Sequence, residues 1–455
     1  MQAEENKRLA ESEADRANTN AEIALRNQKT AEENAEEARQ AKLLADKRRY
    51  LSIAKAIAIK SKEINDDEQA SILAQQGYNF NSKYEGYAFD NDIYNGLFFA
   101  LERYDHPLTR SLQGHQRGAA RALVTRTQED LIYSGGSDGR IIRWQHKNGQ
   151  WVAETIVTNQ DYQIYSMDIS DNGTHLISAG LNTTNASNNY VILYDLGNLS
   201  SKRIEGFVNG IENVEFTPDG KGFYARDNSG KSIRYSDLTS AREVISSTVK
   251  LTSIDLSPDG NLLAGAGDNG SLFIWDVKNN YSVREIKNLA RSITSVAFTS
   301  VKDQVVIGDY SGQVKILNNG VVVRTLSGHI SPVEQIKFNH KGNFMATASK
   351  DKTVRLWNLN KLNEQPIVLS DHHDWIWSIA FTPDDEQLLA GLQSTAETLK
   401  GVEETIHAWP TKIETMSNIL CGEISRNMTK EEWDLYVGDD LTYETTCPNY
   451  PENYK

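Results

Sequence analysis

Residues 328–358 read GHISPVEQIKFNHKGNFMATASKDKTVRLWN. Apolar and polar residues alternate in short segments of this stretch, and clusters of Gly, Asn, Asp and Lys separate the segments. Alternation with a period of two predicts half-buried strands, and clusters of Gly, Asn and Asp predict tight turns. The stretch therefore predicts a series of short strands that are joined by turns.

The middle of this stretch recurs along the chain at nearly constant spacing. Successive copies are 47, 40, 42, 40 and 43 residues apart, and their leading residues are Ile169, Phe216, Leu256, Phe298, Phe338 and Phe381. A repeat of this length, made of short strands, matches one four-stranded blade of a β-propeller. The units predict a mainly β fold with seven blades over residues 108–410. We expect Leu108–Leu112 to form the outer strand of the last blade, which removes a free sheet edge.

Two of the units share four polar and aromatic positions. In these positions the chain resembles the WD-repeat family, in which a His, a Ser or Thr, a turn Asp and a Trp form a hydrogen-bonded set within one blade. The resemblance implies one set of His329, Ser349, Asp351 and Trp357, and another of His115, Ser137 or Ser134, Asp138 and Trp144.

Residues 1–50 predict a helical rod, because they contain no Gly or Pro. Alanine occupies positions 3, 10, 17, 24, 31, 38 and 45, and Ala14, Ala21 and Ala35 add a second seam position. This seven-residue repeat is typical of a coiled coil, and the rod would be about 70 Å long. A single solvated helix and a helix that oligomerises or docks on a partner both stay open. Lys7, Gln28 and Lys42 interrupt the seam, which favours docking on another chain.

A small helical adaptor is predicted for residues 51–107. One helix should continue from the rod, a second should follow Asp66-Asp67, and a third should begin near Asp90. The Asn-, Tyr- and Gly-rich segment from Gly77 to Phe89 is expected to be a loop. Residues 411–455 are predicted to form a helical and extended tail, in which Thr429 and Glu432 make a capping box.

Long Ala- and Glu-rich helices, a helical adaptor and a propeller together resemble the C-terminal sensor half of bacterial signal-transduction NTPases of the STAND class. The tail from Arg426 to Trp433, followed by Thr446-Cys447-Pro448, is also similar to the ends of such proteins. The NTPase half has no counterpart in this sequence. The chain would then be a fragment, a processed product or a relative that keeps only the sensor.

The charge of the chain disfavours nucleic acid as a ligand. The formal net charge is -14, of which the rod, with ten basic and eleven acidic residues, carries almost none. An acidic surface repels phosphate groups. No apolar run is long enough to span a bilayer, so membrane association would have to come from a larger assembly. The partners we expect are therefore proteins, bound through the propeller and the N-terminal helix.

No motif in the sequence predicts a cofactor, a metal site or a catalytic set. Ser229-Gly-Lys-Ser232 lacks the upstream glycine of a phosphate-binding loop, since residue 225 is Ala. We therefore expect a non-enzymatic protein. An enzymatic alternative, a hydrolase or lyase with its site in the central channel, requires acids or histidines at equivalent inner-strand positions. We expect mainly apolar and hydroxyl residues there.

Cys421 and Cys447 are the two cysteines of the chain. A pair of free thiols in a reducing compartment and a disulfide in an oxidising compartment both stay open. The tails of the resembling proteins often carry both cysteines, which favours the disulfide. The compartment is cytoplasmic by default and periplasmic if the disulfide forms.

Partner-binding residues are expected on one loop face of the propeller, because loops carry function on a rigid scaffold. In WD-repeat proteins, contact residues commonly stand six and four positions before the leading residue of each repeat. Carried over to this chain, the resemblance implies Gln163, Tyr165, Glu212, Lys250, Glu334, Trp375 and Trp377. The two tryptophans are the strongest candidates, because Trp is enriched at interface hot spots. The expected function is that of an interaction scaffold or sensor, with a purely structural spacer as a further alternative.

Overall fold

The computed structural model describes residues 2–115, 118–126, 130–147, 150–370, 375–394 and 406–451. These residues form two compact units, one of Met1–Ala88 with Arg426–Lys455 and the other of Phe89–Ser425. The division differs from the predicted one, because the adaptor is split at residue 88 and most of the tail joins the N-terminal helices.

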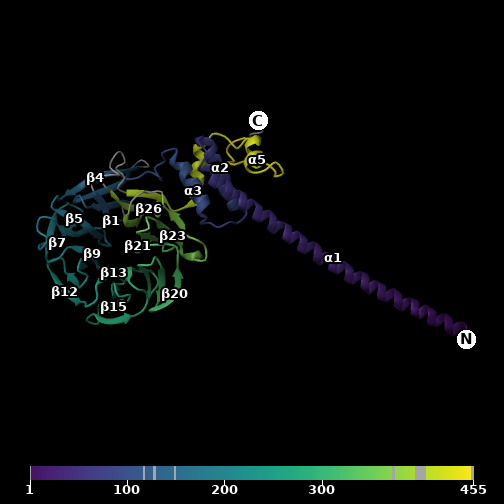
Figure 1. The fold of residues 1–455 in the computed structure, drawn as a ribbon, viewed down its shortest axis with the longest axis horizontal. Coiled ribbons are helices and arrows are strands. Elements are labelled where there is room, and N and C mark those ends of the chain that lie inside the picture. Colours follow the sequence, from purple (N-terminus) through teal and green to yellow (C-terminus); the bar gives the residue numbers. More distant parts are fainter. Residues whose placement is uncertain are drawn as a thin grey trace. The chain divides into compact units, whose positions relative to one another are not determined.

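The unit Phe89–Ser425 is built on a seven-bladed β-propeller, as predicted (Figure 1). Each blade is an antiparallel sheet in which the strands follow one another from the inside outwards. The first three blades comprise β1 (Gly118–Arg126), β2 (Leu131–Gly136), β3 (Arg140–Lys147) and β4 (Gln150–Thr158); β5 (Tyr162–Ile169), β6 (His175–Asn182), β7 (Asn189–Asp195) and β8 (Ser201–Phe207); and β9 (Ile211–Phe216), β10 (Phe223–Asp227), β11 (Ser232–Ser236) and β12 (Ala241–Ser246).

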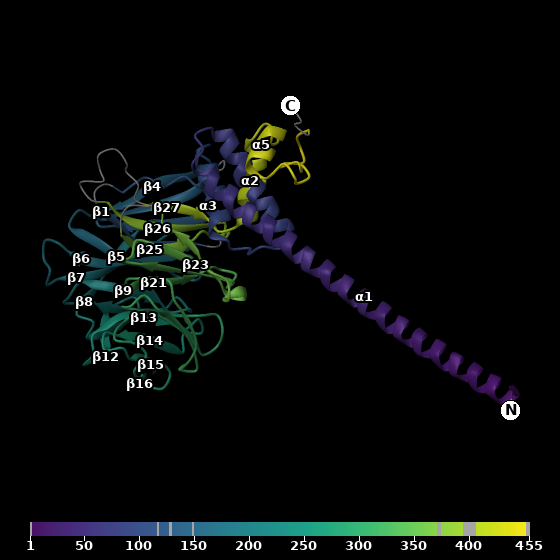
Figure 2. The ribbon, with the colours of Figure 1, turned by 45° about the vertical axis from the view of Figure 1, so that its right-hand side comes forward.

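The next four blades complete the disc, which Figure 2 shows from a more oblique direction. They comprise β13 (Leu251–Leu256), β14 (Leu262–Gly267), β15 (Leu272–Asp276) and β16 (Ser282–Ile286); β17 (Ile293–Phe298), β18 (Gln304–Asp309), β19 (Val314–Asn318) and β20 (Val321–Leu326); β21 (Val333–Phe338), β22 (Phe344–Ser349), β23 (Val354–Asn358) and β24 (Ile367–Leu369), with a 3-10 turn at Leu359–Lys361; and β25 (Ile376–Phe381), β26 (Gln387–Ser394) and β27 (Ile406–Pro410).

The ring is closed where the chain enters the propeller. Leu112 forms an antiparallel bridge with Ile406 of β27, and the Leu112 N–H donates to the Ile406 carbonyl at 2.8 Å. Leu112 thus closes the last blade, but the predicted outer strand over Leu108–Leu112 is wrong in extent, because residues 108 and 109 form a turn and only Leu112 pairs with β27. A segment from before the first blade is thereby tied to the seventh, which protects the edge of β27.

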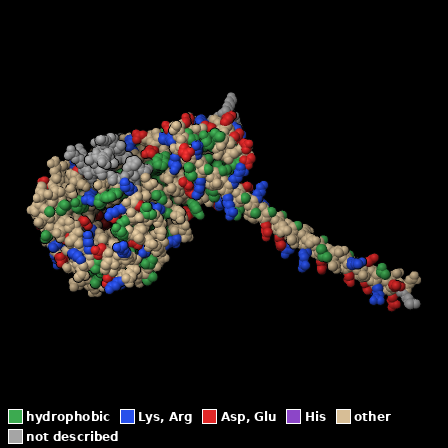
Figure 3. Space-filling model, in the orientation of Figure 1, with side chains coloured by type: hydrophobic (Ala, Val, Ile, Leu, Met, Phe, Trp, Pro, Cys, Tyr) green, Lys and Arg blue, Asp and Glu red, His purple; other side chains and the backbone are tan. Residues whose placement is uncertain are grey.

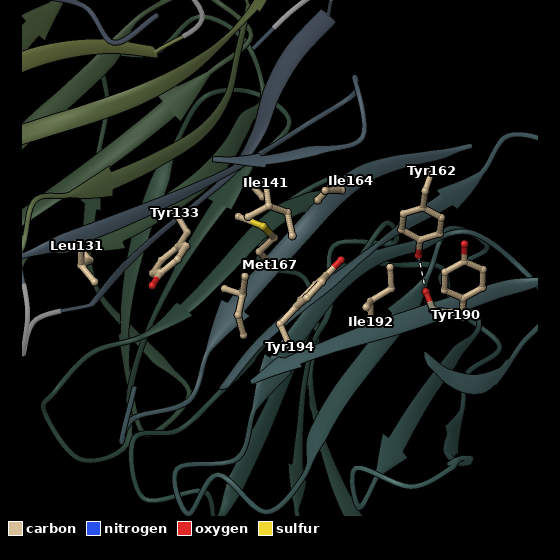
Figure 4. Close-up of a cluster of buried hydrophobic side chains, with 11 residues drawn as sticks. Leu131, Tyr133, Ile141, Tyr162, Ile164, Met167, Tyr190, Ile192 and Tyr194 are labelled. Atoms are coloured by element: carbon tan, nitrogen blue, oxygen red, sulfur yellow. Dashed lines mark hydrogen bonds between the residues drawn. The ribbon is translucent and has the colours of Figure 1, made fainter. Parts of the chain in front are cut away.

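The core of the propeller lies between neighbouring blades. Figure 4 shows one such layer between the first and second blades, where Tyr133 and Ile141 face Ile164, Met167 and their neighbours. The Tyr162 hydroxyl donates to the Tyr190 carbonyl within this layer. Successive residues of a strand point to opposite faces, so Leu176 and Tyr190 pack in this layer while Ile177 and Val191 pack against the third blade.

Two helices belong to the propeller unit, α3 (Asn91–Glu102) and α4 (Ile413–Glu423). They pack on one another, and α3 begins at Asp90, whose carboxylate accepts from the N–H groups of Asp92 and Ile93. The Tyr94 hydroxyl of α3 donates to the Pro410 carbonyl at the end of β27 at 2.8 Å. The third helix of the predicted adaptor is therefore part of the propeller unit.

The other unit begins with α1 (Gln2–Ser61), one continuous helix of 60 residues. At 1.5 Å per residue it is about 90 Å long. Residues 2–46 are exposed, and Figure 3 shows acidic, basic and apolar side chains distributed along this part. The helical rod was predicted correctly, and the helix continues past residue 50 to Ser61, as was expected for the first helix of the adaptor. None of the helices described is long and apolar enough to cross a bilayer.

The helix α2 (Asp67–Lys83) packs against the last turns of α1. It begins at Asp66, as predicted, but it continues through Gly77, where a loop was expected. A Cβ on Gly77 would lie 2.9 Å from the Ala54 carbonyl oxygen and 3.3 Å from the Ala58 Cβ. Gly77 therefore permits close helix contact and does not end the helix.

The C-terminal segment packs on these helices through α5 (Lys430–Tyr436). The predicted capping box is present, since the Thr429 hydroxyl accepts from the Glu432 N–H and the Glu432 carboxylate accepts from the Thr429 N–H. Trp433 is fully buried, with its ring centroid 5.8 Å from that of Phe80 on α2. Both Cys421 and Cys447 are disulfide-bonded.

Candidate interaction face of the propeller

The first and sixth blades contain the hydrogen-bonded sets that the resemblance implied. In the first blade, His115 Nδ1 lies 3.0 Å from Asp138 Oδ1, and His115 Nε2 lies 2.8 Å from the Ser134 hydroxyl. The Trp144 indole N–H donates to the same hydroxyl at 2.8 Å. A neutral His115 with its proton on Nδ1 satisfies every group, so the set holds the turn against the sheet. Ser134 is thus the hydroxyl of this set.

The hydroxyl in the sixth blade is Thr347, and the expectation of Ser349 is wrong. The Trp357 indole N–H donates to Thr347 Oγ1 at 3.0 Å, and His329 Nε2 lies 2.8 Å from the same oxygen. Trp357 is paired with Met345, so Thr347 is its diagonal neighbour on the same face of the sheet. Ser349 lies two residues farther along β22, where its hydroxyl donates to the Ser331 carbonyl.

Burial and hydrogen bonding act in opposite directions on Asp351. Burial alone would raise the pKa of its carboxyl group, but hydrogen bonds from His329 and Thr353 outweigh burial and hold the pKa well below its usual value. His329 Nδ1 lies 2.9 Å from Asp351 Oδ2. Asp351 is therefore ionised throughout the physiological range.

A β-bulge occurs at the same place in the inner strand of all seven blades. In each blade the pairing between the inner strand and the second strand skips one residue of the inner strand. The skipped residue has no opposite residue in the second strand. Bulges often re-aim a side chain. We call these residues the bulge ring: Arg121, Tyr165, Glu212, Thr252, Thr294, Glu334 and Trp377.

The bulge ring lines the central cavity, which has a volume of about 780 Å³. Four of the sequence-predicted contact residues belong to the ring: Tyr165, Glu212, Glu334 and Trp377. The other three, Gln163, Lys250 and Trp375, stand two residues earlier in their blades and do not line the cavity. The structure thus separates an inner group of candidates from an outer one.

Arg121 lies between two aromatic rings of the bulge ring. Its guanidinium carbon is 4.3 Å from the ring centroid of Tyr165 and 4.0 Å from that of Trp377. Burial lowers the pKa of Arg121, and Tyr165 and Glu212 act against this effect. Because arginine titrates far above neutral pH, the group stays cationic. Two cation–π contacts therefore hold a charged side chain at the opening of the channel.

Sequence reasoning missed Arg121, because the first blade has no copy of the recurring phrase. The hydroxyl residues of the two hydrogen-bonded sets provide a signal that could have found it. Arg121 stands thirteen residues before Ser134, and Glu334 stands thirteen residues before Thr347.

Polar neighbours hold both aromatic rings in place. The Trp377 indole N–H donates to Gln393 Oε1 at 3.1 Å, and the Tyr165 hydroxyl donates to Gln163 Oε1 at 2.9 Å. Gln163 thus supports Tyr165. Trp375 is 45% exposed, and its ring centroid lies 6.5 Å from that of Trp377 in an edge-to-face arrangement. An exposed tryptophan that touches the bulge ring is a suitable anchor for a partner.

Three carboxyl groups line the channel three residues after the bulge residue of their strands. We had expected mainly apolar and hydroxyl residues at these inner-strand positions. Asp168, Glu215 and Asp255 occupy equivalent positions in three consecutive inner strands. Each accepts a hydrogen bond from a backbone N–H in the next blade, namely that of Phe216, Leu256 and Phe298.

These acids meet the positional requirement of the enzymatic alternative, but their hydrogen bonds assign them to the contacts between blades. Burial raises the pKa of Asp168 to about 6 and that of Asp255 to about 7, while the pKa of Glu215 is raised by burial and by the charge of Asp255. In the part of the chain that the structure describes, no group of three His, Cys, Asp or Glu side chains is placed to hold a metal ion.

Comparison with known proteins agrees with this architecture. Three segments, residues 242–276, 320–358 and 363–399, match the family model described as "WD domain, G-beta repeat". The matched segments include parts of five blades and the set around His329. The chain is therefore a seven-bladed β-propeller that contains WD repeats.

The curated relatives share only parts of their length with this chain. An anaphase-promoting complex subunit cdc20 of Dictyostelium discoideum is 27% identical over 183 residues, which are 37% of this chain and 35% of the relative. A WD repeat and SOCS box-containing protein 1 of Mus musculus is 31% identical over 120 residues, 25% of this chain and 28% of the relative. A protein LST8 homolog of Drosophila melanogaster is 22% identical over 269 residues, 56% of this chain and 83% of the relative. The chain thus spans about a third of the length of the Dictyostelium relative and less than a third of the mouse relative. The name of the Dictyostelium relative describes it as a subunit of a complex.

Proposed function

We propose that this protein is a non-enzymatic interaction scaffold or sensor that binds a protein or peptide through Trp375, Trp377, Arg121 and Tyr165. We call these four residues the interaction face. The observation that carries the proposal is the exposed Trp375 beside a ring of bulge residues whose aromatic members are already held in position. Rigid aromatic anchors lose little conformational entropy on binding, which favours affinity. The relative that is named as part of a complex supports this function.

The N-terminal helix supplies a second contact in this proposal. Residues 2–46 of α1 are exposed along a seam of alanines, and exposed apolar residues such as Leu25 and Leu43 flank the seam. In proteins most of the stability of a helix comes from packing of one face, which the described residues do not provide for residues 2–46. We propose that it docks on another chain of a larger assembly. The resemblance to STAND-class sensor halves supports a role in signalling, in which binding at the interaction face is coupled to that assembly.

The proposal is tested by replacing Trp375 and Trp377 by Ala and isolating partners from cells of the source organism. A matched control replaces Val321 and Val323, which are exposed on the outer strand β20, by Ala. The double tryptophan variant should lose at least one partner that the control retains, and both variants should melt cooperatively. Recovery of every partner by the tryptophan variant would reject this face and favour a structural spacer.

A further inference from the structure

Four members of the bulge ring already use their polar groups within the propeller. The Glu212 carboxylate lies 2.9 Å from Arg226 Nη2, and that of Glu334 lies 3.2 Å from Lys350 Nζ. The remaining two polar groups are hydroxyls that donate to carbonyls of the next blade, Thr252 to Ile293 at 2.8 Å and Thr294 to Val333 at 2.7 Å. The third to sixth blades therefore offer few free groups at the opening.

The other three members lie in adjacent blades and contact each other. Arg121 of the first blade lies between Tyr165 of the second and Trp377 of the seventh. Within the described residues, Arg121 has no carboxylate within ion-pair distance, whereas Glu212 and Glu334 each have a cationic partner. The unbalanced charge at the opening is thus a cation, although the chain as a whole is strongly acidic.

The rings restrict how Arg121 can bind a ligand. Aromatic contacts occupy the faces of a guanidinium group and leave its N–H edges available for planar acceptors. A carboxylate accepts two such N–H groups side by side. Since Gln163 and Gln393 hold the two rings, the guanidinium is positioned before a ligand arrives, which lowers the entropy cost of binding.

We infer that the interaction face binds a carboxylate side chain of an acidic, extended peptide segment of the partner, with Arg121 pairing the carboxylate and Trp375 contacting a neighbouring residue. This inference rests on the proposed function and specifies its partner. Arg121 lines the cavity, and Trp375 lies outside it beside Trp377. A peptide that crosses the opening of the cavity can therefore contact Arg121 and Trp375 together.

A dianionic phosphate fits this opening less well than a carboxylate. Sites for phosphorylated peptides generally use clusters of arginines. Here the bulge ring supplies one arginine, and Arg226, which also lines the cavity, is already paired with Glu212.

The test uses the full-length protein and fluorescein-labelled hexaglutamate, compared with hexaglutamine, by fluorescence anisotropy at about 0.15 M salt. Hexaglutamate should bind at least about tenfold more tightly than hexaglutamine, as expected for a charge-assisted bidentate pair. Arg121→Gln should abolish this preference and Arg121→Lys should keep part of it. Arg242→Gln, an exposed arginine on the outer strand β12, should leave it unchanged.

Equal or absent binding of the two peptides by the unaltered protein would overturn the inference, and so would a preference that survives Arg121→Gln. A phosphoserine hexapeptide forms a third arm, and tighter binding of this probe than of hexaglutamate, lost in Arg121→Gln, would replace the carboxylate by a phosphate. Failure of the peptides together with tryptophan-dependent recovery of partners would reject the carboxylate and leave the proposed face intact.

Discussion

His329 Nδ1 lies 2.9 Å from Asp351 Oδ2, while Nε2 of the same ring lies 2.8 Å from the Thr347 hydroxyl. The histidine thus joins the turn of the sixth blade to the hydroxyl that also accepts from Trp357. His329, Thr347 and Trp357 are buried, so the removal of the hydroxyl leaves two buried polar groups without that partner.

We therefore expect Thr347→Val to lower the free energy of unfolding by about 2–3 kcal/mol, because it leaves the imidazole and the indole N–H unsatisfied. Ser349→Ala should cost less, about 1 kcal/mol, because the Ser331 carbonyl and the Asp351 N–H that lose its hydroxyl lie in a part-buried position. Urea denaturation of the two variants measures the difference. A larger loss for Ser349→Ala would restore Ser349 to the set.

The corresponding hydrogen-bonded set in the first blade gives a matched prediction. Ser134→Ala should resemble Thr347→Val in its effect, because the Ser134 hydroxyl accepts from Trp144 and contacts His115. Thermal unfolding would check this. If Ser134→Ala unfolded at the same temperature as the unaltered protein, the hydrogen-bonded set in the first blade would not contribute to stability.

The channel acids should make stability fall as the pH rises. Burial raises the pKa of Asp255 from 3.8 to about 7, so the folded protein binds more protons than the unfolded chain between these values. The free energy of unfolding therefore decreases with rising pH in this window. Asp255→Asn should flatten the dependence, as denaturation at pH values across the window would show. An unchanged slope would contradict the burial of this charge.

Gly77→Ala should destabilise the protein, although alanine is favoured over glycine in helices by about 1 kcal/mol. The new Cβ would lie 2.9 Å from the Ala54 carbonyl oxygen. Gly422→Ala on α4 is the matched control, because a Cβ there meets nothing within 4 Å. The control should be neutral or stabilising in thermal unfolding. A gain for Gly77→Ala would mean that α1 and α2 pack less closely.

Docking of α1 on another chain predicts that the isolated protein is monomeric. Sedimentation equilibrium at micromolar concentration should give a mass near 51.0 kDa. Lys7, Gln28 and Lys42 in the seam are the reason, since charged and polar seam residues weaken self-association. A stable dimer would instead assign the alanine seam to a second copy of this chain.

Much of the propeller could be predicted from the sequence, because each repeat carries its own strands and turns. The spacing of Phe298, Phe338 and their counterparts fixes the blade length, and Leu112 closes the ring as expected. The choice between Ser349 and Thr347 required the register of β22 against β23, which the repeat pattern does not specify.

The site was harder to predict than the fold. Arg121 has no recognisable motif around it, and its role comes from two rings that other blades supply. Asp168, Glu215 and Asp255 were overlooked because their partners are backbone N–H groups of the next blade, which a linear sequence does not place nearby. Gly77 was interpreted as a helix end, because the close packing of α1 against α2 at this residue depends on the tertiary structure and leaves no local signal in the sequence.

The central claim, that a partner contacts the interaction face, is tested most directly by photo-crosslinking in cells of the source organism. Benzoylphenylalanine would be placed at position 375 of the full chain, and at position 323 on β20 as an exposed control. We predict a discrete adduct from position 375 and none of the same mass from position 323. Absence of an adduct at position 375, or the same adduct from both positions, would contradict the account.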